Sequence, residues 1–146
     1  MVKELYVVAF DASLEQLKRY SKYFESDAMK VLGINPTFVT PIHTIKGLTD
    51  ALENPQRPGL LIIDGNPDSG VTLNEAVSAN TAIGVHPLEM IILSDDPEVI
   101  GEAKARSLKA APKSDYLVVL KNILHDYGRG KGRCINLKNP AAQYAS

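Results

Sequence analysis

Short apolar runs that alternate with amphipathic helical patterns constrain the fold of this chain more than any other feature. The runs at residues 5–10, 60–63 and 90–93 are continuous and rich in β-branched residues, and they are too short for buried helices. They predict strands that are buried on both faces, and residues 36–42 predict another. Because helical patterns separate these strands, we expect a parallel sheet with helices on both faces.

Capping residues mark where the helices begin. Ser13 and Gln16 form a capping box, in which each side chain accepts a hydrogen bond from the backbone N–H group of the other residue. The first helix is expected to run to Gly33, because glycine readily ends a helix in a left-handed conformation. The other predicted helices begin after Thr44 (residues 46–53), after Thr72 with Glu75 as a second capping box, after Asp96, and after Ser114.

Residues 116–120 fit two interpretations. Taken alone, this apolar run predicts a strand. However, the apolar positions continue at helical spacing to Tyr127, and Gly128 would end such a helix. We favour the helix, which leaves a short fifth strand around residues 107–109.

Composition limits the number of domains, the binding partners and the cellular location that this chain can have. With 146 residues, 45% of them hydrophobic and 23% charged, the chain fits one globular domain, expected over residues 1–127 with a tail at 128–146. A net charge of -1 gives no general attraction to nucleic acid or to an anionic membrane, and no apolar run approaches the roughly 20 residues of a membrane-spanning helix. Cys134 is the only cysteine, which excludes an internal disulfide and favours a reducing cytoplasm.

Polar residues follow several of the predicted strands directly. Asp11, Asp64 and Ser94 each come after an apolar run, and Lys109 follows the short fifth strand. In doubly wound sheets, ligands bind outside the carboxyl ends of the strands. We therefore expect Asp11, Asp64 and Ser94 to share one cleft at that edge, with Lys109 beside them.

Around these residues the chain resembles the receiver domain of bacterial response regulators, over about residues 3–127. Residues 61–64 followed by Asn66, Pro67 and Gly70 are similar to the third-strand motif of the family, and residues 91–94 are similar to the fourth. Lys109 with Pro112 is similar to the fifth-strand lysine region. The resemblance implies a flavodoxin-like, doubly wound sheet of five parallel strands in the order 2-1-3-4-5, with helices on both faces.

The same resemblance implies phosphoryl chemistry at Asp64. Asp64 would be the phosphoacceptor, and Ser94 and Lys109 would bind the oxygens of the phosphoryl group. Asp11, Asp64 and Asn66 would hold a Mg²⁺ ion that neutralises the charge of the two approaching anions. The family carries an acidic pair where this chain has Ala9 and Phe10, so we expect weak Mg²⁺ binding.

Two function classes follow from this pattern. In the first, the chain is a component of a phosphorelay in a two-component system, phosphorylated at Asp64. In the second, it is a pseudo-receiver that binds partners without phosphorylation. Both imply a cytoplasmic protein that acts through a histidine kinase, a phosphotransfer protein or an effector, and both leave a homodimer open.

Enzyme classes find less support in the sequence. A Gly-x-Gly-x-x-Gly motif, a Walker-type loop and a Gly-x-Ser-x-Gly elbow are all missing from it. We therefore expect a signalling domain and not an enzyme, with a small α/β enzyme as the remaining alternative. The glycine-spaced basic residues at 129–133 are expected to be a solvated part of the tail and not a nucleic-acid site.

Overall fold

A computed structural model describes residues 3–41, 44–53, 59–66, 70–82 and 88–128. Its centre is one sheet of five parallel strands in the order β2-β1-β3-β4-β5. The flavodoxin-like α/β fold and the strand order expected from the sequence are therefore confirmed. The strands are β1 (Lys3–Phe10), β2 (Ile34–Val39), β3 (Gly59–Ile63), β4 (Glu89–Ser94) and β5 (Lys109–Pro112).

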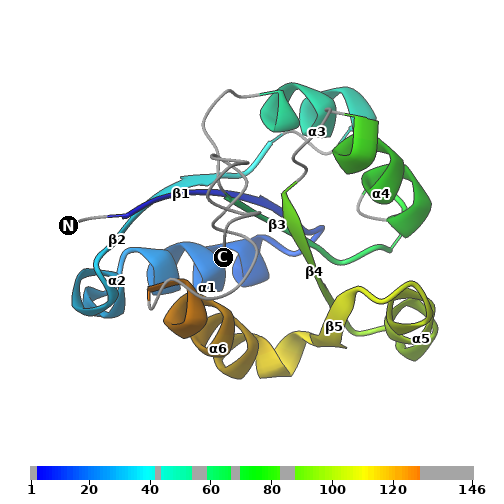
Figure 1. Ribbon diagram of the computed structural model, residues 1–146. Helices are drawn as coiled ribbons and strands as arrows, with labels where there is room; N and C mark the ends of the chain where they lie inside the picture. Colours follow the sequence, from blue (N-terminus) through cyan, green and yellow to red (C-terminus); the bar gives the residue numbers. More distant parts are fainter. Residues whose placement is uncertain (1–2, 42–43, 54–58, 67–69, 83–87, 129–146) are drawn as a thin grey trace, which may run out of the picture.

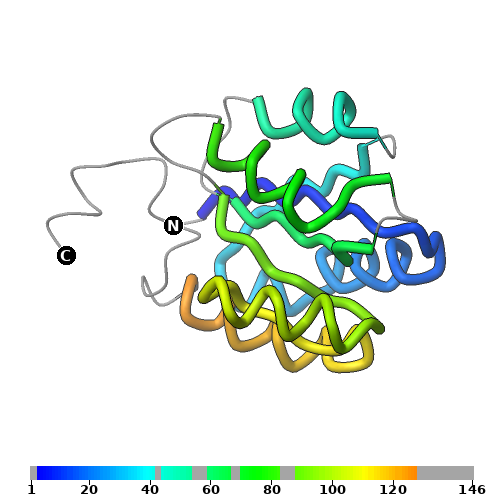
Figure 2. The backbone as a smooth tube through the Cα atoms, turned by 90° about the vertical axis from the view of Figure 1, so that its right-hand side faces the viewer, coloured from blue at the N-terminus to red at the C-terminus, as the bar shows by residue number. Residues whose placement is uncertain are grey.

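Helices lie on both faces of this sheet. Helices α1, α2 and α6 lie on one side of it, and α3 and α4 lie on the opposite side (Figure 1). Figure 2 shows the same separation from a second direction. The bounds are α1 (Leu14–Phe24), α2 (Asp27–Leu32), α3 (Ile45–Leu52), α4 (Leu73–Ala82), α5 (Pro97–Ala105) and α6 (Tyr116–Gly128).

The two faces of the sheet bury two separate apolar clusters. Successive side chains of a strand point to opposite faces, so Val7 joins one cluster and Val8 the other. The first cluster includes Leu17 of α1 and Leu124 of α6, whereas the second includes Leu48 of α3. Burial on both faces explains why the strands read as continuous apolar runs.

Most of the predicted caps are present, but the first helix is divided. Helix α1 ends at Phe24, where the hydroxyl of Ser26 donates to the carbonyl of Tyr23 at 2.6 Å. Helix α2 then ends at Leu32 and is capped by Gly33, whose φ of +71° is left-handed. A single helix over residues 14–32 was therefore a wrong expectation, because a serine side chain takes up a backbone carbonyl at the break.

The chain between α5 and α6 also differs from the expectation. Residues 116–120 are helical, as favoured, and a short 3-10 turn, η2 (Lys113–Asp115), precedes them. The fifth strand begins at Lys109 and is not centred on residues 107–109. Ser107 has a φ of +62°, and the N–H of Leu108 still donates to a carbonyl of α5, so these residues complete the end of that helix.

Candidate functional site

The strand register places Asp11 and Asp64 at the same edge of the sheet. Phe10 pairs with Ile63, and each aspartate is the next residue along its strand. The N–H of Asp64 donates to the carbonyl of Phe10 at 3.3 Å, which continues the ladder by one step. Only 1% of Asp11 and 2% of Asp64 is exposed. Two buried carboxyl groups therefore lie on neighbouring strands.

Strands β4 and β5 bring a hydroxyl and an ammonium group to this edge. Ser94 is the last residue of β4 and pairs with Pro112, the last residue of β5. Lys113 follows directly, and its Nζ lies 3.0 Å from Oδ1 of Asp11 and 3.8 Å from Oδ2 of Asp64. One ammonium group thus faces both carboxylates.

Lys109, which the sequence pattern favoured as the site lysine, lies elsewhere. It is the first residue of β5, and its Nζ forms an ion pair at 3.0 Å with Glu89, the first residue of β4. The expectation is corrected because the strand was placed too early in the chain. Lys113 was missed because the strand that precedes it holds only two alanines between Lys109 and Pro112, which gives almost no apolar signal. Proline is tolerated on an edge strand, so Pro112 could have marked this strand's end.

Asp11 has two roles at this edge. Its Oδ1 accepts a hydrogen bond from the N–H of Ser13 at 2.8 Å and another from Lys113 at 3.0 Å. Its Oδ2 is buried and has no hydrogen-bond partner among the residues that the structure describes. A buried carboxylate oxygen without a partner is costly, and a bound cation would satisfy it.

The loop after Asp64 is fixed by its own backbone. Oδ1 of Asp64 accepts from the N–H of Asn66 at 3.2 Å. Gly65 has a φ of +68°, and a Cβ atom there would lie 2.8 Å from Cγ1 of Val99. The left-handed φ and the close approach of Val99 both favour glycine at this position. Asn66 is therefore held beside Asp64, whereas Pro67, which the family resemblance also uses, lies outside the described residues.

Ser94 is buried at the start of the turn into α5. Its Oγ accepts a hydrogen bond from the N–H of Asp96 at 3.1 Å, and Asp96 itself caps the helix by accepting from Glu98 at 2.9 Å. A hydroxyl that accepts one bond still has a hydrogen to donate. The predicted helix start is confirmed, and Ser94 lies at the expected end of the sheet.

The buried hydroxyl of Tyr20 lies beneath this edge of the sheet, and its pKa responds to the charges there. Burial raises the pKa of its hydroxyl above the ordinary value. The nearby Gln16 side chain opposes that shift, whereas the charges of Asp11, Asp64 and Asp95 add to it.

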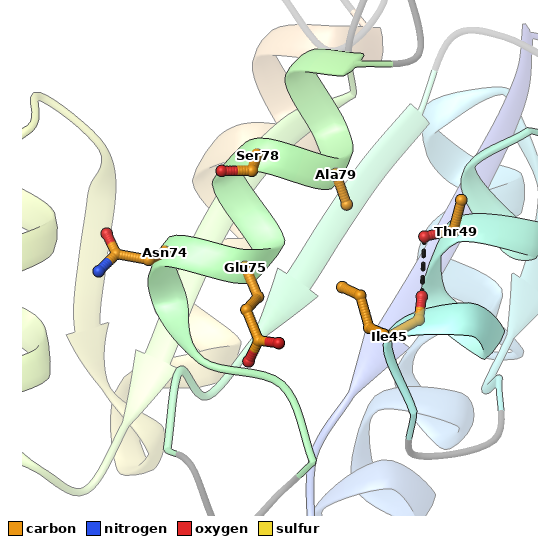
Figure 3. A pocket seen from close by; sticks show the side chains of 6 residues that line it. All are labelled: Ile45, Thr49, Asn74, Glu75, Ser78 and Ala79. Carbon is orange, nitrogen blue, oxygen red and sulfur yellow. Dashed lines mark hydrogen bonds between the residues drawn. The ribbon is translucent and has the colours of Figure 1, made fainter.

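Two cavities are found between the helices and loops of the described residues. One, of about 390 Å³, is open to solvent beside Lys113 and is also lined by Gln16, Asp95 and Tyr116. The other, of about 440 Å³, lies between α3 and α4 (Figure 3). Its wall includes Thr49, whose hydroxyl donates to the carbonyl of Ile45, but neither site aspartate. Neither cavity is lined by Asp11 or Asp64, but the first is lined by Lys113 and therefore adjoins the site.

No family model, curated protein or solved structure matches this chain. Its candidate site therefore rests on geometry. Within the described residues, three or more histidine, cysteine, aspartate or glutamate side chains do not gather in one metal-binding group, so a cation would use the two aspartates with backbone or water oxygens. Also within the described residues, no helix is long and apolar enough to cross a membrane.

Proposed function

We propose that this chain is an atypical receiver-like signalling domain whose phosphoacceptor is Asp64. The observation that carries the proposal is the assembly of Asp11, Asp64, Ser94 and Lys113 at the ends of four neighbouring strands. A carboxylate nucleophile, a hydroxyl donor and an ammonium group are the residue types that phosphoryl transfer to an aspartate requires.

In the proposed reaction, an oxygen of Asp64 attacks the phosphorus of a phosphohistidine on a partner protein. The new P–O bond forms as the P–N bond breaks, and the imidazole nitrogen keeps the electron pair. Ser94 donates to one phosphoryl oxygen, and Lys113 turns from Asp11 to pair with another. In this proposal the lysine role first considered for Lys109 passes to Lys113.

A divalent cation fits this arrangement, although few protein ligands are present for it. Asp11, Asp64 and Asn66 would hold Mg²⁺, and the unpartnered Oδ2 of Asp11 is an oxygen of the type that this ion prefers. The ion would supply neutralisation of the charge that develops as two anions approach. Lys113 already supplies one positive charge to both aspartates, so weak Mg²⁺ binding is part of the proposal.

Acetyl phosphate with Mg²⁺ provides the direct test, read by intact-protein mass spectrometry. We expect the mass gain of one phosphoryl group, removable by hydroxylamine as an acyl phosphate should be. Asp64→Asn should abolish the gain. Asp96→Asn is the matched control, because asparagine also caps helices well, and it should retain the gain. A phosphoryl group that persists in Asp64→Asn, or no phosphoryl group in the unmodified chain, would contradict the proposal.

A phosphorylation-independent binding module is the second candidate, and one observation favours it. Ala9 and Phe10 are 0% and 1% exposed and pack into opposite apolar clusters. Acidic side chains at those positions would enter the core and not the site, so the metal site cannot be completed there. This alternative predicts that beryllofluoride with Mg²⁺ leaves the amide NMR spectrum unchanged. Shifts centred on Asp64 would exclude it.

A further inference from the structure

The side chain of Gln16 does not form the capping-box hydrogen bond that its sequence position predicts. A capping box would direct its side chain back to the N–H of Ser13. That N–H instead donates to Oδ1 of Asp11 at 2.8 Å. The amide of Gln16 therefore leaves the cap, and its Nε2 donates to the carbonyl of Lys113 at 3.5 Å. Asp11 therefore accepts the hydrogen bond from Ser13 that Gln16 would accept in a capping box.

Gln16 is also too buried to be a simple surface cap. Only 3% of the residue is exposed, and it lies on the inner face of α1 with Leu17 and Tyr20. Its Oε1 accepts from Arg19 at 3.0 Å. A buried amide needs such partners, because an unsatisfied one costs free energy. Both ends of this side chain are therefore used, and one end reaches the turn that carries the site lysine.

These contacts close a ring of hydrogen bonds through the site. Ser13 N donates to Asp11, and Gln16 N donates to Oγ of Ser13 at 3.2 Å. The side chain of Gln16 donates to the backbone of Lys113, and the ammonium group of Lys113 returns to Asp11 at 3.0 Å. The ring joins the first turn of α1 to the entry of α6, which are separated by about a hundred residues of sequence.

We infer that Gln16 is a positioning residue, which holds the backbone of Lys113 so that its ammonium group stays on Asp11 until a phosphoryl group or cation displaces it. Because the ring passes through the cap of α1, movement of Lys113 must also disturb that cap. The inference deepens the proposed function by naming a residue that regulates the same site. Only the identity of the group that displaces the Lys113 ammonium depends on the proposed function.

The reactivity of the Lys113 amine tests this inference without any phosphodonor. The full chain is treated with a limiting amount of an acetylating reagent, and the acetylation rate of each lysine is followed by peptide mass spectrometry. Gln16→Met keeps the size and apolar contacts of the side chain but removes the amide. We expect the rate at Lys113 to rise about threefold to tenfold in this variant, the range that loss of one hydrogen bond spans. The rates at Lys46 and Lys109 should stay constant.

Two further variants separate positioning from general loosening. Arg19→Met removes the other partner of Gln16, a part-buried contact made by a half-exposed side chain. Because the amide nitrogen that donates to Lys113 is left in place, the Lys113 rate should stay within about twofold of the unmodified chain. Asp11→Asn should raise the rate at least as much as Gln16→Met. Gln16→Leu repeats the test if Gln16→Met does not fold.

Two results would overturn the inference. One is a Lys113 rate in Gln16→Met equal to that of the unmodified chain. The other is an equal rise at all lysines, because that reports unfolding and gives Gln16 only a structural role. Failure of acetyl phosphate to modify Asp64 would count against the proposed function and would leave this result unaffected.

Discussion

Asp11 and Asp64 occupy equivalent positions on neighbouring parallel strands, and one ammonium group serves both carboxylates. The equivalence comes from the pairing of Phe10 with Ile63, and the ammonium is that of Lys113. Two negative charges and one positive charge leave the cluster with a net negative charge in a buried setting. The ammonium group of Lys113 thus partly occupies the place that a bound metal ion would take.

Removal of that ammonium group should strengthen the binding of a metal ion. We expect Lys113→Met to raise the affinity for Mg²⁺ or Mn²⁺ by about tenfold or more, since a pair of charges near 4 Å apart interacts by about 4 kcal/mol at an intermediate dielectric. Calorimetric titration measures the affinity. Lys109→Met is the matched control, because its ion pair with Glu89 lies at the other end of the sheet. Equal affinities in Lys113→Met and the unmodified chain would show that the ammonium does not compete.

Asp11 should contribute to stability through its contacts as well as to the site. Asp11→Ala removes the acceptor for Ser13 and for Lys113, and we expect a loss of about 1–3 kcal/mol in the free energy of unfolding. Asp11→Asn keeps an oxygen for Ser13 and should lose less. Urea unfolding measures the difference. Asp27→Ala should change stability by about 0.5 kcal/mol or less, because the Asp27 side chain is 94% exposed and lies 4.0 Å from Lys30. Equal losses at Asp11 and Asp27 would contradict this account.

Tyr20 should make the fold sensitive to alkaline pH. Burial raises the pKa of its hydroxyl in the folded chain above the 10.0 of an exposed tyrosine. The unfolded chain therefore loses the proton first, and the stability that the neutral hydroxyl contributes is present below pH 10.0 and is lost as the pH rises beyond it. Tyr20→Phe should flatten this decline. Thermal melts of both chains between pH 8 and pH 11 (roughly the window set by an ordinary tyrosine pKa) measure it, and parallel declines would refute the prediction.

Ser94 should act through its hydroxyl if the proposed function holds. Ser94→Ala removes the donor to the phosphoryl oxygen and should slow phosphorylation of Asp64 by acetyl phosphate by about tenfold to a hundredfold. Ser94→Thr keeps the hydroxyl and should retain most of the rate. The rate is followed by intact-protein mass spectrometry. A normal rate in Ser94→Ala would remove Ser94 from the site.

The sequence predicts the position of a site residue well where a long apolar strand precedes it. The runs that end at Phe10 and Ile63 are unbroken, so their ends, and with them Asp11 and Asp64, follow from the pattern alone. The fold class follows for the same reason, because each such run is separated from the next by a helical pattern.

The sequence predicts less where stability comes from contacts between distant parts of the chain. Strand β5 is half-exposed at the sheet edge and needs little hydrophobicity, so its four residues resemble a loop in sequence and Lys113 was overlooked. The role of Gln16 could not be predicted either. Its local motif specifies one partner, whereas its observed partner lies on a turn 97 residues further along the chain.

The late position of Lys113 in the chain has a consequence for the order of assembly. During synthesis, β1 and β3 are complete long before residue 113 is added, so the two aspartates can meet before their shared counter-ion exists. The repulsion between the carboxylates of Asp11 and Asp64 then opposes their approach. Docking of β5 brings the ammonium group of Lys113 to them and relieves this repulsion. A nascent chain that lacks Lys113 should therefore keep its two aspartates further apart than the complete chain does. The same charges that form the candidate site would thus delay its maturation until the whole sheet has formed.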